Sequence, residues 1–186
     1  MSSTNTASDE LSQILTEYCN RYMNISDSVK NLLTEVSEDL RNELLSSITD
    51  SDGDTVLTVA AYRGHTELCV TLLLSLPPAD RLKLIPAYEF AALWRYTETV
   101  SGILNCLTAD QQLQLLFTQN SDGNTALHYA AGRGHTEIVK TMLDNLTTDQ
   151  RLQLLIQNSN DDTALHYAAH EGCTETVKTL LDNLTP

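Results

Sequence analysis

Three residues near the end of the sequence have the spacing of metal ligands: His166, His170 and Cys173. Histidines four residues apart share a helix face, and imidazole and thiolate are common zinc ligands. However, Gly172 comes directly before Cys173 and indicates a helix end, and the sequence offers no evident fourth ligand. We therefore expect neither a metal site nor a cofactor.

The aspartates Asp50, Asp52 and Asp54 superficially resemble a calcium-binding loop. Such a loop carries a bidentate glutamate at its twelfth position, where this sequence has Ala61. A hydrophobic helical segment also follows at once, which favours a hairpin tip. No nucleophile elbow, phosphate-binding loop or H-E-x-x-H helix occurs elsewhere. We therefore predict that the chain is not an enzyme.

The chain is strongly acidic, with 25 acidic against 11 basic residues and a formal net charge of −14. Nucleic acid repels such a surface, and no basic patch offsets it, so we expect no nucleic-acid partner. No apolar run approaches the roughly 18–20 residues of a membrane span, and no secretory signal is evident. We therefore expect no membrane partner.

The four cysteines lie far apart, in neither a disulfide framework nor a zinc-finger spacing. This usage favours reduced thiols and a cytoplasmic location. The cysteines are Cys19, Cys69, Cys106 and Cys173.

An internal repeat is the clearest feature of the sequence. Residues 122–146 read DGNTALHYAAGRGHTEIVKTMLDNL, and residues 160–184 read NDDTALHYAAHEGCTETVKTLLDNL. An earlier copy, residues 52–76, reads DGDTVLTVAAYRGHTELCVTLLLSL. A degenerate copy, residues 86–104, aligns with residues 125–143 at a constant offset of 39.

Each copy predicts two helices. The Asp-Gly pair before Thr125 predicts a tight turn, because glycine tolerates positive φ, and Thr125 can cap the helix that follows. Ala130 and Ala131 allow this helix to pack closely, and Gly134 ends it. A second helix begins near Thr136, with apolar residues at helical spacing. Its predicted buried face comprises Ile138, Val139, Met142, Leu143 and Leu146.

This pattern resembles the ankyrin-repeat family. The run T-A-L-H-Y-A-A-G-R-G-H-T-E-I-V is similar to the family signature T-P-L-H-x-A-A-x-x-G-H-x-E-I-V, with Ala126 and Ala164 in the proline position. The resemblance implies an all-α solenoid of stacked helix-turn-helix units with short hairpin-like turns. The period of 38–39 exceeds the usual ~33 residues, and the surplus lies in a D-Q-R-L-Q-L-L-like tail. We expect this tail to form an extra helical turn or a short third helix.

We expect an N-terminal helical capping segment at residues 1–47, with a flexible start of about eight residues. Residues 28–45 resemble the second half of a repeat with its tail. Because terminal repeats need a polar outer face and the last repeat has no polar capping helix, we expect a longer natural protein. The repeats are predicted at about 48–85, 86–116, 117–155 and 156–186.

The second repeat departs most from the pattern. It lacks the Asp-Gly turn, and Glu89, Arg95 and Tyr96 hold its His, Gly and His positions. We expect the turn before it to be missing or flattened. The long-period repeats also look similar to ankyrin proteins of intracellular bacteria and their symbionts.

The repeated histidines are predicted to be structural. His128 and His166 occupy the T-x-x-H position, where imidazole and threonine hydroxyl bond into the turns between repeats. His65 and His135, in G-H-T-E, are expected to orient the loop between the two helices.

The resemblance implies a protein–protein interaction module. In ankyrin-like arrays the turn residues and the two residues before G-H line the concave, partner-facing side. Tyr, Trp and Arg are enriched at binding hot spots, although Trp94 has the alternative of packing into the space of the missing turn. The candidate partner-binding residues are Tyr62, Arg63, Leu93, Trp94, Arg133, His170, Glu171, Asp52, Asp54, Asp122, Asn124, Asn160 and Asp162.

The acidic turns favour a partner protein with a basic or mixed-charge surface. Two alternatives stay open. The chain is either the targeting or substrate-recruiting arm of a larger enzyme or bacterial effector, acting in a host cytosol, or it assembles as a homo-oligomer through its uncapped C-terminal face.

Overall fold

The computed structural model describes residues 3–20, 26–144 and 146–184. Within them lie thirteen α-helices, one 3-10 helix and, as the sole β pairing, an isolated bridge between Thr49 and Thr55. The predicted all-α fold is confirmed. The chain forms two compact units, Met1–Ala87 (unit 1) and Tyr88–Pro186 (unit 2). None of the described helices is long and apolar enough to cross a membrane.

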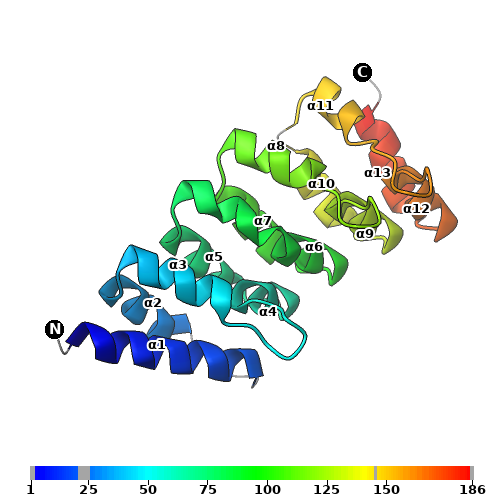
Figure 1. Cartoon of the computed structure of the whole chain (residues 1–186). Coiled ribbons are helices and arrows are strands. Elements are labelled where there is room, and N and C mark those ends of the chain that lie inside the picture. Colours follow the sequence, from blue (N-terminus) through cyan, green and yellow to red (C-terminus); the bar gives the residue numbers. More distant parts are fainter. Residues whose placement is uncertain (1–2, 21–25, 145, 185–186) are drawn as a thin grey trace. The chain divides into compact units, whose positions relative to one another are not determined.

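Unit 1 contains the N-terminal segment and the first repeat (Figure 1). Helix α1 packs on α2 and α4, and α2 packs on α5, so the N-terminal segment has the inner, outer and tail helices of a repeat. Helix α1 includes residues 3–8, for which the sequence predicts flexibility. The helices are α1 (Ser3–Asn20), α2 (Ser26–Glu35), α3 (Glu38–Ser47), α4 (Val56–Tyr62), α5 (Thr66–Ser75) and η1 (Pro78–Leu84).

Unit 2 stacks its helix pairs in register. Inner helix α9 packs on α12, and outer helix α10 packs on both α7 and α13 (Figure 1). Helix α6 (Ile85–Leu93) crosses the boundary between the two units. The others are α7 (Thr97–Asn105), α8 (Ala109–Phe117), α9 (Ala126–Gly132), α10 (Thr136–Leu143), α11 (Thr148–Gln153), α12 (Ala164–His170) and α13 (Thr174–Leu184).

Small residues bring the inner helices of unit 2 close together. Ala130 and Ala131 are fully buried, as the sequence predicts. A Cβ atom at Gly132 would lie 3.1 Å from the Tyr167 ring, so this glycine makes room for the next repeat. On the outer helix, four of the five predicted buried residues are buried, and Leu146 is half-buried.

The tails form the expected extra helices, and they also cap the helices before them. Thr108 and Thr147 start α8 and α11 with capping boxes. Further along, Gln112 Nε2 donates to the Leu104 carbonyl at 2.8 Å, and Arg151 Nε donates to the Leu143 carbonyl at 3.1 Å. These carbonyls lie at the ends of the outer helices α7 and α10, where they also accept bonds from the Leu107 and Leu146 N–H groups beyond each helix. The long period therefore adds a side-chain bond to the C-terminal ends of these two outer helices.

The degenerate second repeat keeps the loop geometry of the other repeats without their sequence. The chain passes from η1 directly into α6, so no hairpin turn precedes this repeat. Arg95 has φ 66°, close to φ 68° at Gly134, although this left-handed region favours glycine. The Tyr96 N–H bonds to the Ala91 carbonyl at 2.9 Å, and the equivalent His135 N–H bonds to Ala130 at the same distance. Arg95 and Tyr96 therefore occupy the positions that the sequence offset assigns to them.

Candidate functional site

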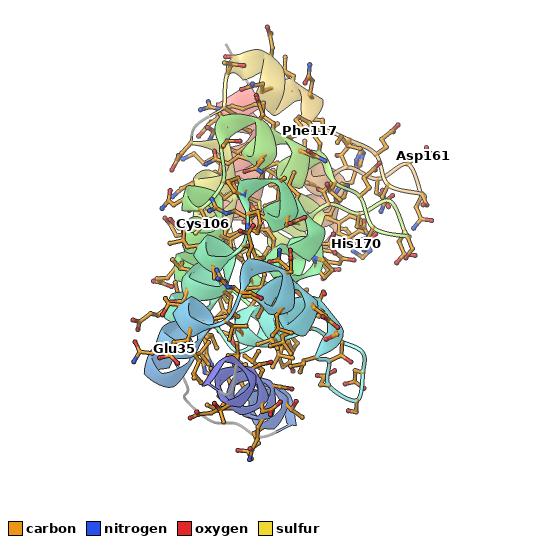
Figure 2. The ribbon with its side chains drawn as sticks, turned by 60° about the vertical axis from the view of Figure 1, so that its left-hand side comes forward. Glu35, Cys106, Phe117, Asp161 and His170 are labelled. Atoms are coloured by element: carbon orange, nitrogen blue, oxygen red, sulfur yellow. The ribbon has the colours of Figure 1, made fainter. Side chains whose placement is uncertain are left out.

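The hairpin turns of the first, third and fourth repeats share one hydrogen-bond pattern. They begin with Asp50, Asn120 and Asn158, whose Oδ1 atoms accept bonds from the N–H groups two and four residues later, at 2.9–3.0 Å. The side chain of Asp50 therefore holds a hairpin tip, as predicted. The fourth residue of each turn is left-handed: Gly53, Gly123 and Asp161, with φ 86°, 76° and 63°. Figure 2 shows Asp161 on a turn that extends away from the helices.

The last two turns are bonded to each other, which corrects one predicted site residue. The Ser159 N–H donates to the Asp122 carbonyl at 3.0 Å, and Asn158 Nδ2 donates to Asn124 Oδ1 at 2.8 Å. A Cβ atom at Gly123 would lie 2.8 Å from the Ser159 nitrogen, so the approach requires glycine. Asn124 is only 7% exposed because its side chain joins the two turns. It is not available to a partner, and we leave it out of the candidate surface.

His128 has the predicted structural role. Its Nδ1 accepts from the Thr125 N–H at 3.1 Å and from the Thr125 hydroxyl at 2.9 Å, while Nε2 donates to the Asp162 carbonyl at 3.2 Å. This pattern requires a neutral ring with its proton on Nε2. Burial lowers the pKa of His128, and the bond to Asp162 opposes the shift. His128 thus joins its own helix to the turn of the next repeat.

The side chains of His65 and His135 bond to residues outside the loops that contain them. His135 Nε2 donates to the Leu93 carbonyl of the preceding repeat at 3.1 Å, and His65 Nδ1 lies 2.7 Å from the Tyr18 hydroxyl of α1. Burial lowers the pKa of both histidines. Each histidine therefore bonds its loop to the preceding helical layer. This contact cannot be predicted from the sequence of a single repeat, because its partner lies in another one.

The possible zinc ligands His166, His170 and Cys173 have other contacts. His166 Nδ1 is bonded to Thr163, His170 lies 3.1 Å from the Glu171 carboxylate, and the Cys173 thiol lies 3.7 Å from the Gly132 carbonyl. The described residues contain no group of three side chains that could hold a metal ion. They also contain no disulfide, and the side chain of Cys19 lies outside them.

A groove of about 510 Å³ in unit 2 brings predicted site residues together. Leu93, Arg133 and Glu171 come from three successive repeats and line the same groove, as do Tyr129 and Tyr167. A neighbouring hollow of about 330 Å³ shares Tyr167 and Glu171 and adds Asp162, His166 and His170. The two hollows therefore form one surface, which we call the unit 2 groove. His170, on α12, is marked in Figure 2.

Tyr129 and Tyr167 line the groove but are not among the candidate residues predicted from the sequence. Asn120 Nδ2 donates to the Tyr129 hydroxyl at 2.6 Å, and Asn158 Nδ2 donates to the Tyr167 hydroxyl at 3.0 Å. The signal was present, because the third and fourth repeats pair an asparagine at the turn with a tyrosine nine residues later. The first repeat has Asp50 and Val59 at these positions.

The remaining candidates lie outside the unit 2 groove. Trp94 is 49% exposed but does not line the groove, and Tyr62 in unit 1 is 43% exposed. Arg63 also has a structural contact, since its Nη1 donates to the Tyr18 carbonyl at 2.7 Å. Among the turn residues, Asp52, Asp122 and Asn160 are exposed and Asp54 is half-buried. Burial raises the pKa of Asp54, and the carboxylates of Asp50 and Asp52 add to the effect.

Comparison with known families identifies the class of this protein. The model of ankyrin repeats matches residues 91–185 in three copies, just over half of the 186 residues. The chain belongs to the ankyrin-repeat family. Ankyrin repeats are protein–protein interaction modules, and the family is typically non-catalytic. No curated protein matches the sequence.

Proposed function

We propose that this protein binds a partner protein through the unit 2 groove. The observation that carries the proposal is the convergence of Leu93, Arg133 and Glu171, from three repeats, beside two tyrosines. Arginine and tyrosine are enriched at the hot spots of protein interfaces. The bonds from the turn asparagines fix both tyrosine hydroxyls, which reduces the entropy lost when a partner orders these side chains.

The charge of the surface favours a basic or mixed-charge partner. Asp162 and Glu171 supply carboxylates, Arg133 supplies one cation, and the whole chain carries −14. Exposed charges of one sign raise association rates more than final affinity. The exposed residues Asp122, Asn160 and Trp94 of unit 2 are proposed to extend the contact. Asp52 and Tyr62 of unit 1 stay candidate partner-binding residues of that unit. We also propose that binding takes place in the cytoplasm.

A differential pull-down tests the proposal. The full chain would be immobilised as wild type, Arg133→Ala and Glu171→Ala, and the captured proteins quantified by mass spectrometry. Lys178→Ala and Glu175→Ala on α13 are matched controls, since both residues are exposed and neither lines the groove. We expect one captured protein to be depleted by both groove variants and retained by both controls. Equal recovery with all five proteins would contradict the proposal.

A second candidate function is homotypic assembly through the last repeat. Leu181 is 47% exposed, whereas its counterpart Leu143, covered by the last repeat, is 1% exposed. Ala169 is likewise exposed and Ala131 buried. Sedimentation velocity on the wild type and on Leu181→Lys tests this candidate. A concentration-dependent dimer that the substitution abolishes would support it, and a monomeric wild type would exclude it.

A further inference from the structure

Helix α5 departs from the other outer helices on its outward face. Val70 stands where the other repeats have Ser101, Lys140 and Lys178, and Leu74 stands where they have Asn105, Asp144 and Asp182. Leu74 is 57% exposed, the highest value among the large apolar side chains that the structure describes. The inward residues Leu68, Cys69, Leu72 and Leu73 are already buried.

Helix α5 is therefore apolar on both faces. A helix with this pattern is normally covered on both sides, and contiguous exposed apolar surface marks interaction sites. The three aligned outer helices carry polar residues at the same two positions, so the repeat fold itself does not require Val70 and Leu74 to be apolar.

The exposed face of α5 borders a groove of about 540 Å³ in unit 1, which is also lined by residues of α2 and α3. Leu33 of α2 lies in the groove and is 2% exposed, and Val70 and Leu74 of α5 line it as well. Arg41 of α3 closes it, since Nη1 donates to the Ser75 carbonyl at 2.8 Å and Nη2 to the Val36 carbonyl at 3.1 Å. These bonds join the C-terminal ends of α2 and α5, so the groove is preformed.

One acidic side chain on this groove has lost the partner that its counterpart has. In α10, Glu137 pairs with Lys140 at 2.8 Å. In α5, Val70 replaces that lysine, and Glu67 makes no ion pair among the described residues. Glu67 is exposed and lines the groove. A cation on a bound partner would therefore find, beside an apolar surface, a carboxylate that makes no ion pair among the described residues.

We propose that this α5 groove binds a peptide segment of a partner protein. The segment inserts an apolar side chain against Leu33, Val70 and Leu74 and places a lysine or arginine beside Glu67. The apolar contact supplies affinity, and Glu67, within a chain of net charge −14, selects the basic residue. The α5 groove is a binding site separate from the unit 2 groove and does not depend on it.

A random peptide library displayed on phage and panned against the full chain tests the proposal. We expect enriched sequences with an apolar residue close to a lysine or arginine. The most enriched peptide would be synthesised and its affinity measured by fluorescence polarisation. Leu74→Asp and Val70→Lys install the residues that α10 and α13 carry, and each should weaken binding about 10- to 100-fold. Glu67→Gln should weaken binding less and flatten its salt dependence.

Leu152→Asp is the matched control, because Leu152 is another exposed leucine, at 47%, on α11 of unit 2. Leu74→Asp should keep the melting temperature of the wild type, which separates loss of binding from loss of folding. Arg133→Ala should leave peptide affinity unchanged, which separates this site from the unit 2 groove.

Three results would overturn the proposal. In the first, no enriched peptide depends on Leu74. In the second, Leu152→Asp weakens peptide binding as much as Leu74→Asp does. In the third, sedimentation shows self-association of the wild type that Leu74→Asp abolishes, so that a second copy of the chain occupies the groove.

Discussion

The inner helices α9 and α12 begin with the same six residues, ALHYAA, after the same threonine cap, and the same kinds of turn come before and after them. Both have a threonine cap bonded to the histidine three residues later, with equal distances of 3.1 and 2.9 Å. Their surroundings differ, because His128 is fully buried and His166 is exposed. The local sequence thus sets the geometry of a repeat, and the next repeat decides which of its residues become core.

The largest difference between the two helices is expected for histidine. His128→Ala leaves the Thr125 N–H and the Asp162 carbonyl without their partner in a buried place, and it opens a cavity. We expect a loss of about 3 kcal/mol in the free energy of unfolding. His166→Ala should cost less than about 1 kcal/mol, because water replaces the exposed ring. Urea denaturation of both variants measures the difference, and equal losses would break the comparison.

The next largest difference in stability is expected for leucine substitutions at Ala131 of α9 and Ala169 of α12. Ala131 is enclosed between helical pairs, so Ala131→Leu overpacks the interface and should cost about 2 kcal/mol. Ala169→Leu adds the same side chain to an exposed position and should change stability by no more than about 0.5 kcal/mol. Thermal melting of the two proteins provides the test. An unchanged midpoint for Ala131→Leu would show that the pair of alanines is not closely packed.

The glycines of the two loops should differ by a smaller amount. Gly134 and Gly172 are both left-handed, with φ 68° and 71°, so alanine at either position costs about 1 kcal/mol. A Cβ atom at Gly134 would also lie 3.0 Å from Cys173 Sγ, whereas nothing lies within 4 Å at Gly172. Gly134→Ala should therefore be the more destabilising by about 1 kcal/mol. Adding Cys173→Ala should remove that excess.

The pH dependence of His128 sharpens the comparison further. Burial places the folded pKa of His128 below its unfolded value of 6.5, so below pH 6.5 the unfolded chain binds a proton that the folded chain does not. His128 therefore makes its full contribution to the free energy of unfolding above pH 6.5, and this contribution declines as the pH falls. Glu89, at the equivalent position of the second repeat, has its pKa raised by burial to about 7 and opposes this trend.

The measurement therefore compares two proteins. The difference in unfolding free energy between wild type and His128→Ala should shrink from pH 7.5 to pH 5, because Glu89 is common to both. A constant difference would mean that His128 takes up a proton equally in both states.

The smallest expected effect is that of metal ions on the melting temperature. His166 and Cys173 have contacts within the chain, and a structural zinc ion contributes directly to folding stability. A chelator or added zinc should leave the melting temperature unchanged. A decrease of several degrees with chelator would show that His166, His170 and Cys173 do bind a metal.

Structural features that depend on the residues of a single repeat could be predicted from the sequence. Thr125 marked a helix start, and the offset of 39 assigned Arg95 to a glycine position that its φ of 66° confirms. Burial of Asn124 was not predictable, because it depends on Asn158 of the next turn. The bond from His65 to Tyr18 was hidden for the same reason, since α1 has no sequence signature of a repeat.

The lining of the candidate groove could be predicted only in part. The family positions located Leu93, Arg133 and Glu171, which the structure places in one groove, but they omitted the tyrosines between them. The α5 groove could be recognised only with the structure, since Val70 and Leu74 in the sequence alone are consistent with a buried helix.

The tail helices offer a place where the chain can be lengthened. Helix α11 buries none of its own residues, and its link to the array includes one side chain, Arg151, bonded to the end of α10. Residues added between Leu146 and Thr147, ahead of α11, would lengthen an exposed connection while Arg151 stays bonded to Leu143 and Leu154 stays buried. Loop closure costs rise only slowly with length. The array therefore has a built-in site for insertions, where evolution or an experimenter can attach a new segment while the binding surfaces stay in register.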